Sequence, residues 1–213
     1  MEHVRLGWVE IIDSLKSLLE TGEPMPSVDT TESGSGAGNS AGGIDGNTAA
    51  EITGGWHRQQ AIEANNSVWD LLGDSVTTGD QVDDLLGRAY AAAYHWARAS
   101  GTSVANAARA SWLLSRCCAV VGHAEVALHH ADQCMAAVRS GELADFDLAY
   151  AHEARARSLA ALGRTDEALA ERHAAMSTVV VDPDDRSIFE SDAAAEPWFG
   201  LSTSPADAAS TQG

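Results

Sequence analysis

The chain has 213 residues and a formal net charge of −18, with 31 acidic and 13 basic residues. This length is enough for one domain with a hydrophobic core, and so negative a charge disfavours contact with nucleic-acid phosphates. Three cysteines predict no disulfide framework, and no apolar run approaches the ~20 residues of a membrane span. The N-terminus lacks the basic-then-apolar pattern of a signal peptide. We therefore expect a cytoplasmic protein that binds neither nucleic acid nor membrane.

The first predicted element is an amphipathic helix within residues 1–21. Apolar side chains recur there at helical spacing, and the opposite face is mainly acidic. Helices that lie on membranes favour Lys and Arg on the polar face. We expect this helix to pack on protein instead, either on its own chain or in a homodimer. Its apolar stripe consists of Val4, Trp8, Ile11, Leu15, Leu18 and Leu19.

Composition changes sharply after the first helix. Residues 22–54 are rich in Gly, Ser and Thr and poor in apolar side chains, a composition typical of a flexible linker. Residues 55–200 are predicted to form one helical-repeat domain, and residues 201–213 a disordered tail.

Within this domain the pattern predicts one helix after another and no strand, so the expected fold class is all-α. Start signals include the capping box of Thr78 and Gln81 and Asp182 followed by Pro183. Asp145 or Asp147 is predicted to cap the helix that ends at Gly163. The expected helices cover residues 55–73, 78–101, 103–121, 124–140, 145–163 and 165–180, with a last one from 182.

A short motif occurs twice at the turns between these helices. Gly122 is followed by Ala127-Leu128, and Gly163 is followed at the same offset by Ala168-Leu169. Connections this short make neighbouring helices antiparallel. The pattern resembles the tetratricopeptide repeat, a helix–turn–helix unit of about 34 residues, over residues 103–181. The matching positions are Leu114, Ser115, Ala127 and Ala131 in the first copy and Ala156, Leu159 and Ala168 in the second.

This resemblance implies about three stacked antiparallel hairpins whose first helices line a concave groove. The implied lining combines arginines, which bind carboxylates and stack on rings, with aromatic side chains. We therefore predict an interaction scaffold that binds an acidic or amphipathic segment, from a partner protein or from the chain's own "FESDAAAEPWFGL". In the alternative interpretation the arginines are ordinary surface residues and Trp112 fills the core. The lining residues are Arg109, Trp112, Arg116, Tyr150, Glu153 and Arg157.

A second hypothesis is a small-molecule-binding protein or enzyme with a polar pocket around His57, His95 and His152. His152 shares a helical face with apolar residues and is expected to face inward. The sequence contains no nucleophile elbow and no phosphate-binding glycine loop. It therefore predicts no cofactor and leaves catalysis an open question.

The stretch "GHAEVALHHADQC" raises the question of a metal site, because His130 and Cys134 share one helix face. Zinc needs three or four ligands, usually with a second recognisable pair, and the sequence contains neither CxxC nor HExxH. We predict an exposed His129 and His130 beside a core Cys134, since a buried free cysteine behaves as a small hydrophobe.

Overall fold

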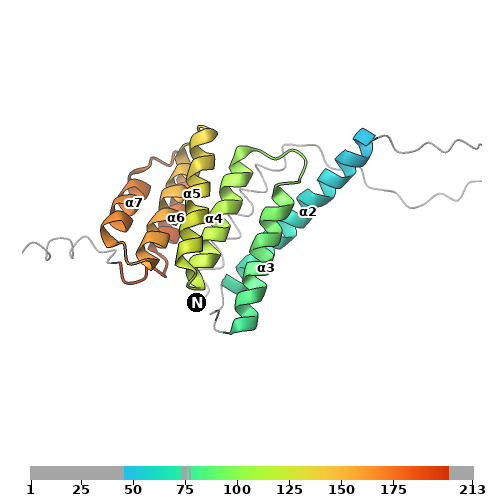
Figure 1. Cartoon of the computed structure of the whole chain (residues 1–213). Coiled ribbons are helices and arrows are strands. Elements are labelled where there is room, and N and C mark those ends of the chain that lie inside the picture. The colour runs from blue at the N-terminus through green and yellow to red at the C-terminus, as the bar shows by residue number, and fades with distance from the viewer. Residues whose placement is uncertain (1–45, 73–75, 77, 202–213) are drawn as a thin grey trace, which may run out of the picture.

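The computed structural model describes residues 46–72, 76 and 78–201, and their regular secondary structure is entirely α-helical (Figure 1). The predicted all-α fold class is confirmed for this part of the chain. The helix expected in residues 1–21, most of the predicted linker and nearly all of the predicted tail lie outside the described residues. The helices are α2 (Gly46–Leu72), α3 (Gly79–Trp96), α4 (Val104–Val120), α5 (Ala124–Ser140), α6 (Asp145–Ala161), α7 (Thr165–Ser177) and α8 (Pro183–Ala194).

The first described helix begins earlier than predicted. Helix α2 starts at Gly46, so residues 46–54 of the predicted linker are helical. Gly54 lies against the end of the α2–α3 hairpin, where its carbonyl oxygen accepts a hydrogen bond of 3.1 Å from the Ser100 amide. A Cβ atom at Gly54 would lie 2.9 Å from that of Ser100. The glycine that suggested a linker therefore permits close packing of a helix.

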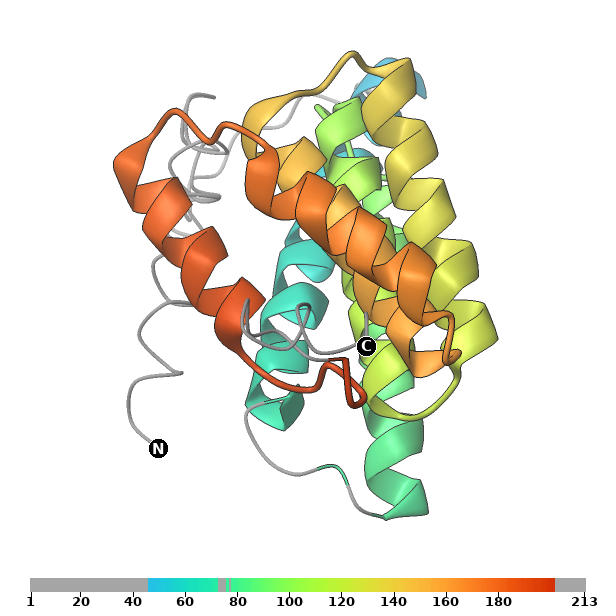
Figure 2. The ribbon, with the colours of Figure 1, turned by 90° about the vertical axis from the view of Figure 1, so that its left-hand side faces the viewer.

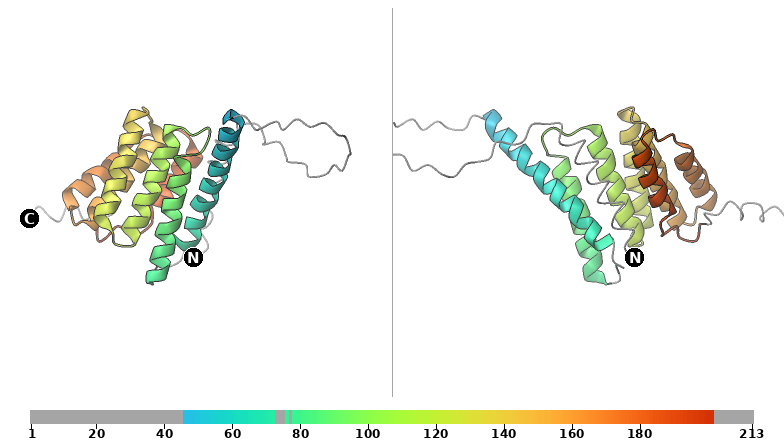
Figure 3. Two further views of the ribbon diagram at one scale, coloured as in Figure 1. Left: turned by 45° about the vertical axis from the view of Figure 1, so that its right-hand side comes forward. Right: turned by 180° about the vertical axis from the view of Figure 1, so that it is seen from behind.

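Antiparallel hairpins α2–α3, α4–α5 and α6–α7 stack side by side, as predicted (Figures 1 and 3). Successive hairpins touch through α3 and α4 and through α5 and α6, and the first helices α4 and α6 also pack on each other. Gly122 and Gly163 adopt φ of 82° and 71° at the turns, a conformation that glycine adopts without steric cost. Ala127 and Ala168 are fully buried, so small side chains stand where the helices approach.

Helix α8 lies outside the three hairpins and packs mainly on α6 (Figure 2). Its predicted start is confirmed, because the Asp182 carboxylate accepts hydrogen bonds from the amides of Asp184 and Asp185, and Pro183 is the first helical residue. After Ala194 the chain returns to α6, and Trp198 and Leu201 pack there with Leu159. We call residues 182–201 the C-terminal segment.

The predicted cap of α6 is wrong. The capping position is occupied by Ala144, which has no side-chain oxygen. Asp145 instead has a φ of 59°, and its carboxylate accepts a hydrogen bond of 3.0 Å from the Val181 amide. Asp147 pairs with Arg109 of α4. Both aspartates therefore form tertiary contacts, which a local capping pattern does not reveal.

Trp112 joins the apolar clusters of the stack. Its ring lies 6.0 Å from that of Trp69 on α2 and 5.1 Å from that of Tyr150 on α6. The three cysteines are buried and unpaired, with Cys134 in the core as predicted. Within residues 46–72, 76 and 78–201, no helix combines the length and apolar character needed to cross a membrane.

Candidate functional site

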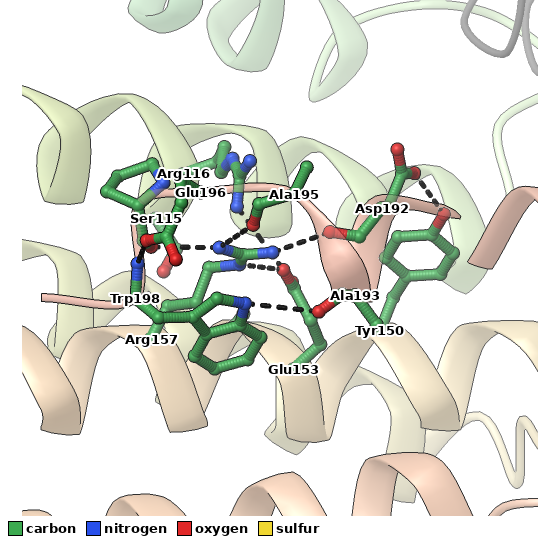
Figure 4. Close-up of polar contacts among 12 residues, drawn as sticks. Ser115, Arg116, Tyr150, Glu153, Arg157, Asp192, Ala193, Ala195, Glu196 and Trp198 are labelled. Carbon is green, nitrogen blue, oxygen red and sulfur yellow. Dashed lines mark hydrogen bonds and ion pairs between the residues drawn. The ribbon is translucent and has the colours of Figure 1, made fainter. Parts of the chain in front are cut away.

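Five of the six predicted groove residues come together where α4 meets α6. Trp112 and Arg116 are one turn apart on α4, and Tyr150, Glu153 and Arg157 follow one another along a single face of α6. Figure 4 shows how several of these side chains converge with residues of the C-terminal segment. The cluster joins three parts of the chain that are distant in sequence.

Glu153 is the centre of this cluster. Its carboxylate accepts hydrogen bonds from Trp112 Nε1 at 3.0 Å, from Arg116 Nη1 at 3.4 Å and from Arg157 Nε. Burial alone would raise the pKa of Glu153, but the charges of Arg157 and Arg116 and the hydrogen bonds together lower it. Glu153 is therefore held ionised inside the protein, where an unpaired carboxylate would be costly.

Arg157 connects α6 to the C-terminal segment through main-chain atoms. Its side chain is 2% exposed. Nη1 donates to the carbonyl oxygens of Ala195 at 2.9 Å and Pro197 at 2.8 Å, and Nη2 donates to that of Asp192 at 2.6 Å (Figure 4). The guanidinium lies 4.0 Å from the centre of the Trp198 ring, a cation–π contact. We call Arg157 and these partners the Arg157 cradle.

Two aromatic side chains, Phe189 and Trp198, hold the C-terminal segment on α6. Trp198 is buried, and its Nε1 donates to the Ala193 carbonyl oxygen at 3.1 Å. The ring of Phe189 lies 5.1 Å from that of Tyr150. Phe199, the other aromatic residue of the predicted segment, remains 38% exposed. Phe189 and Trp198 therefore anchor the segment.

Asp192 is the carboxylate of the C-terminal segment that reaches α6. It accepts a hydrogen bond of 2.5 Å from the Tyr150 hydroxyl. Burial raises the pKa of Asp192 to about 6, and the charge of Glu153 adds to this effect. The Tyr150 hydrogen bond and the charges of Arg116 and Arg157 oppose it without cancelling it. This environment therefore disfavours ionisation of Asp192 relative to water, and the carboxylate predominates only above about pH 6.

Arg109 lies apart from Glu153, in a bidentate pair with Asp147 at 2.8 and 3.2 Å. An open groove at this position, as the sequence predicted, is not present. The cavity there is too narrow for a water molecule, and the C-terminal segment covers the neighbouring face of α6. The residues that line this narrow cavity are Trp112, Ser115, Arg116, Ala119, Glu153, Ala154 and Arg157.

The three histidines of the second hypothesis lie in two separate places. His57 and His95 meet on α2 and α3, with their Nδ1 atoms 2.8 Å apart. His152 on α6 instead contacts Glu171 of α7, with 2.6 Å between Nδ1 and Oε2. The geometry does not join them into one pocket.

One further expectation about the histidines is wrong. His130 is buried and not exposed, because α3 and α5 enclose it: Tyr90 lies 3.3 Å from Nε2, and Gln133 lies 3.0 Å from Nδ1. His129 is exposed, as predicted. In the described part of the chain, no group of three or more His, Cys, Asp or Glu side chains is arranged to hold a metal ion.

Three comparisons, with protein-family models, with curated proteins and with solved structures, found no match for this chain. The fold and the site therefore define its class: an all-helical stack of antiparallel hairpins whose C-terminal segment packs on α6, next to Trp112 and Arg116 of α4. We call this surface the α4–α6 face.

Sequence reasoning missed the main-chain part of this site. The carbonyl oxygens that Arg157 binds belong to no side-chain pattern, and the hydrogen bond between the Ser115 and Ser158 hydroxyls joins two helices at 3.1 Å without a motif. A usable signal was the pairing of acids with Trp198 in "FESDAAAEPWFGL", which pointed to the segment but not to its contacts.

Proposed function

We propose that this protein is an interaction scaffold whose α4–α6 face recognises a peptide segment, and that its own C-terminal segment takes that place in the described state. The observation that carries the proposal is the Arg157 cradle. One buried guanidinium binds three main-chain carbonyl oxygens and stacks on a tryptophan. Main-chain hydrogen bonds with pockets for selected side chains are a recurring mode of peptide recognition.

The contacts support an amphipathic partner more than an acidic one. Arg157 binds carbonyl groups and no carboxylate of the segment, and Arg109 is already paired with Asp147. The segment's own Asp192 is held by the Tyr150 hydroxyl at a buried position where ionisation is disfavoured relative to water. We therefore expect the partner to be selected by two aromatic anchors spaced like Phe189 and Trp198, and not by carboxylates that pair with these arginines.

The test is a titration of the full chain with a fluorescent peptide of residues 186–201. Trp198→Ala removes an anchor of the bound segment and leaves α4 and α6 unchanged. We expect this variant to bind the peptide at least tenfold more tightly than wild type does, because the internal competitor is weakened. Micromolar affinity is ordinary for such a scaffold.

Phe199→Ala is the matched control, because Phe199 is adjacent and is not an anchor. It should bind the peptide no better than wild type. Arg157→Lys added to Trp198→Ala should weaken peptide binding about tenfold or more, because Lys keeps the charge and loses the planar fork. Saturating peptide should raise the melting temperature of Trp198→Ala. If no variant binds the peptide, or if Phe199→Ala and Trp198→Ala bind it equally, the proposal is wrong.

A further inference from the structure

The first hairpin carries an aromatic patch that remains exposed among the described residues. Trp56 on α2 and Tyr94 on α3 are 53% and 52% exposed, although both are large and apolar. His57 and His95 lie between them, and Ile52 extends the surface by one turn of α2. We call these five residues the α2–α3 patch.

The rings of this patch form one continuous surface. The centre of the Trp56 ring lies 5.0 Å from that of His57 and 5.3 Å from that of His95. The Tyr94 ring lies 5.2 Å from His95 and 6.1 Å from His57. These edge-on contacts and the His57–His95 hydrogen bond preorganise the rings, so a ligand need not order them.

Two arginines border the patch. The Arg98 guanidinium lies 3.7 Å from the centre of the Tyr94 ring. Arg58 donates to the carbonyl oxygens of Ser100 and Gly101, each at 3.3 Å. These contacts fix the two guanidinium groups in place. The patch therefore combines apolar rings with positive charge, in a protein whose net charge is −18.

The position of the patch also suggests what covers it. Terminal units of a repeat stack need a capping element over their apolar surface. The last hairpin is covered on one face by α8, which packs on α6, whereas α2 and α3 form the other end of the stack, where α2 projects from the edge (Figure 1). The nearest sequence before α2 that could supply a capping helix is residues 3–20, which carry the amphipathic stripe.

We propose that residues 3–20 dock on the α2–α3 patch of the same chain through Trp8, Ile11 and Leu15. Residues 21–45 connect this stretch to α2, and a Gly-rich chain of that length spans roughly 25–30 Å. Trp56 lies about 15 Å along α2 from its first residue, at the helical rise per residue. The span of the connecting residues therefore exceeds the distance to the patch.

Tethering favours this occupant. A tether of this kind gives a local concentration on the order of millimolar, above the concentration of a second copy in a dilute solution. The contact is therefore intramolecular.

Hydrogen exchange of the full-length chain tests this proposal. Residues 3–20 should exchange roughly tenfold or more slowly in wild type than in Ile11→Glu, which interrupts the apolar stripe. Ser17→Glu adds the same charge opposite the stripe and should keep the protection. Trp56→Glu changes the docking surface and should also remove the protection of residues 3–20. Met176→Glu, at a residue that is 47% exposed on α7, should leave that protection unchanged.

The competing outcomes are distinguishable. Equal protection of residues 3–20 in Trp56→Glu and wild type would place the docking surface elsewhere and overturn the proposal. Absence of protection in wild type would do the same. Protection that rises with protein concentration would show that a second copy supplies the segment, which also contradicts an intramolecular contact. Unchanged exchange of α4–α6 in every variant confirms that the fold is intact.

Discussion

Replacement of Glu153 by Gln tests the buried charge cluster on which the α4–α6 face depends. Gln keeps the shape of the side chain but removes the negative charge between Arg116 and Arg157. The side chains of Glu153 and Arg157 are both 2% exposed, so water cannot compensate for the lost partner. Removing one member of a buried ion pair costs about 3–5 kcal/mol. We expect a loss of that size in the free energy of unfolding.

The assay is urea denaturation followed by circular dichroism, at about pH 7.5 where the wild-type carboxylate is ionised. Asp84→Asn is the matched control, because Asp84 and Arg88 also form a pair four residues apart, but with side chains 49% and 32% exposed. Such exposed helical pairs contribute about 0.3–0.5 kcal/mol. A Glu153→Gln loss no larger than that of Asp84→Asn would refute the reasoning, because the cluster would then contribute no more than a surface pair.

Three further predictions concern charge, packing and thiol reactivity. Because the pKa of Asp192 is raised from 3.8 to about 6, the folded protein binds a proton at Asp192 more tightly than the unfolded chain does. This difference stabilises the folded state fully below about pH 4, and the stabilisation is lost as pH rises through 6. Asp192→Asn should therefore be about 1–3 kcal/mol more stable than wild type near pH 7.5, and the difference should shrink towards pH 4 in paired urea titrations; equal stability at both pH values would contradict this. Ala168→Leu should cost about 1–3 kcal/mol by overpacking the α6–α7 hairpin, and an unchanged melting temperature would count against that packing. Burial raises the pKa of Cys117 and Cys134 to about 12, so neither should react with a thiol reagent near pH 8 before urea unfolds the chain; rapid labelling of the native protein would show that the two sites are open.

Features that depend on neighbouring residues could be predicted from the sequence. Thr78 and Gln81 form the predicted capping box, and Gly122 and Gly163 occupy the predicted turns. Each of these signals lies within a few residues of the structure that it specifies, which is why the three hairpins could be placed correctly.

Features that depend on distant partners could not be predicted in the same way. Gly54 resembles a linker residue until Ser100 is placed against it. Arg157 resembles a free groove residue until the carbonyl groups of the C-terminal segment reach it. In both cases the deciding contact is with the main chain or with a residue far along the sequence, so the spacing of side chains does not predict it.

The central claim is that the C-terminal segment is an exchangeable occupant of the α4–α6 face and not a fixed part of the core. Native-state hydrogen exchange of the full chain measures this directly, because local openings have smaller free energies than global unfolding. We predict that the amides of residues 188–201 exchange through an opening of lower free energy than those of α4 and α6. We also predict that an added peptide of residues 186–201 accelerates their exchange. Identical opening free energies for the segment and for α4–α6, unaffected by the peptide, would contradict the account.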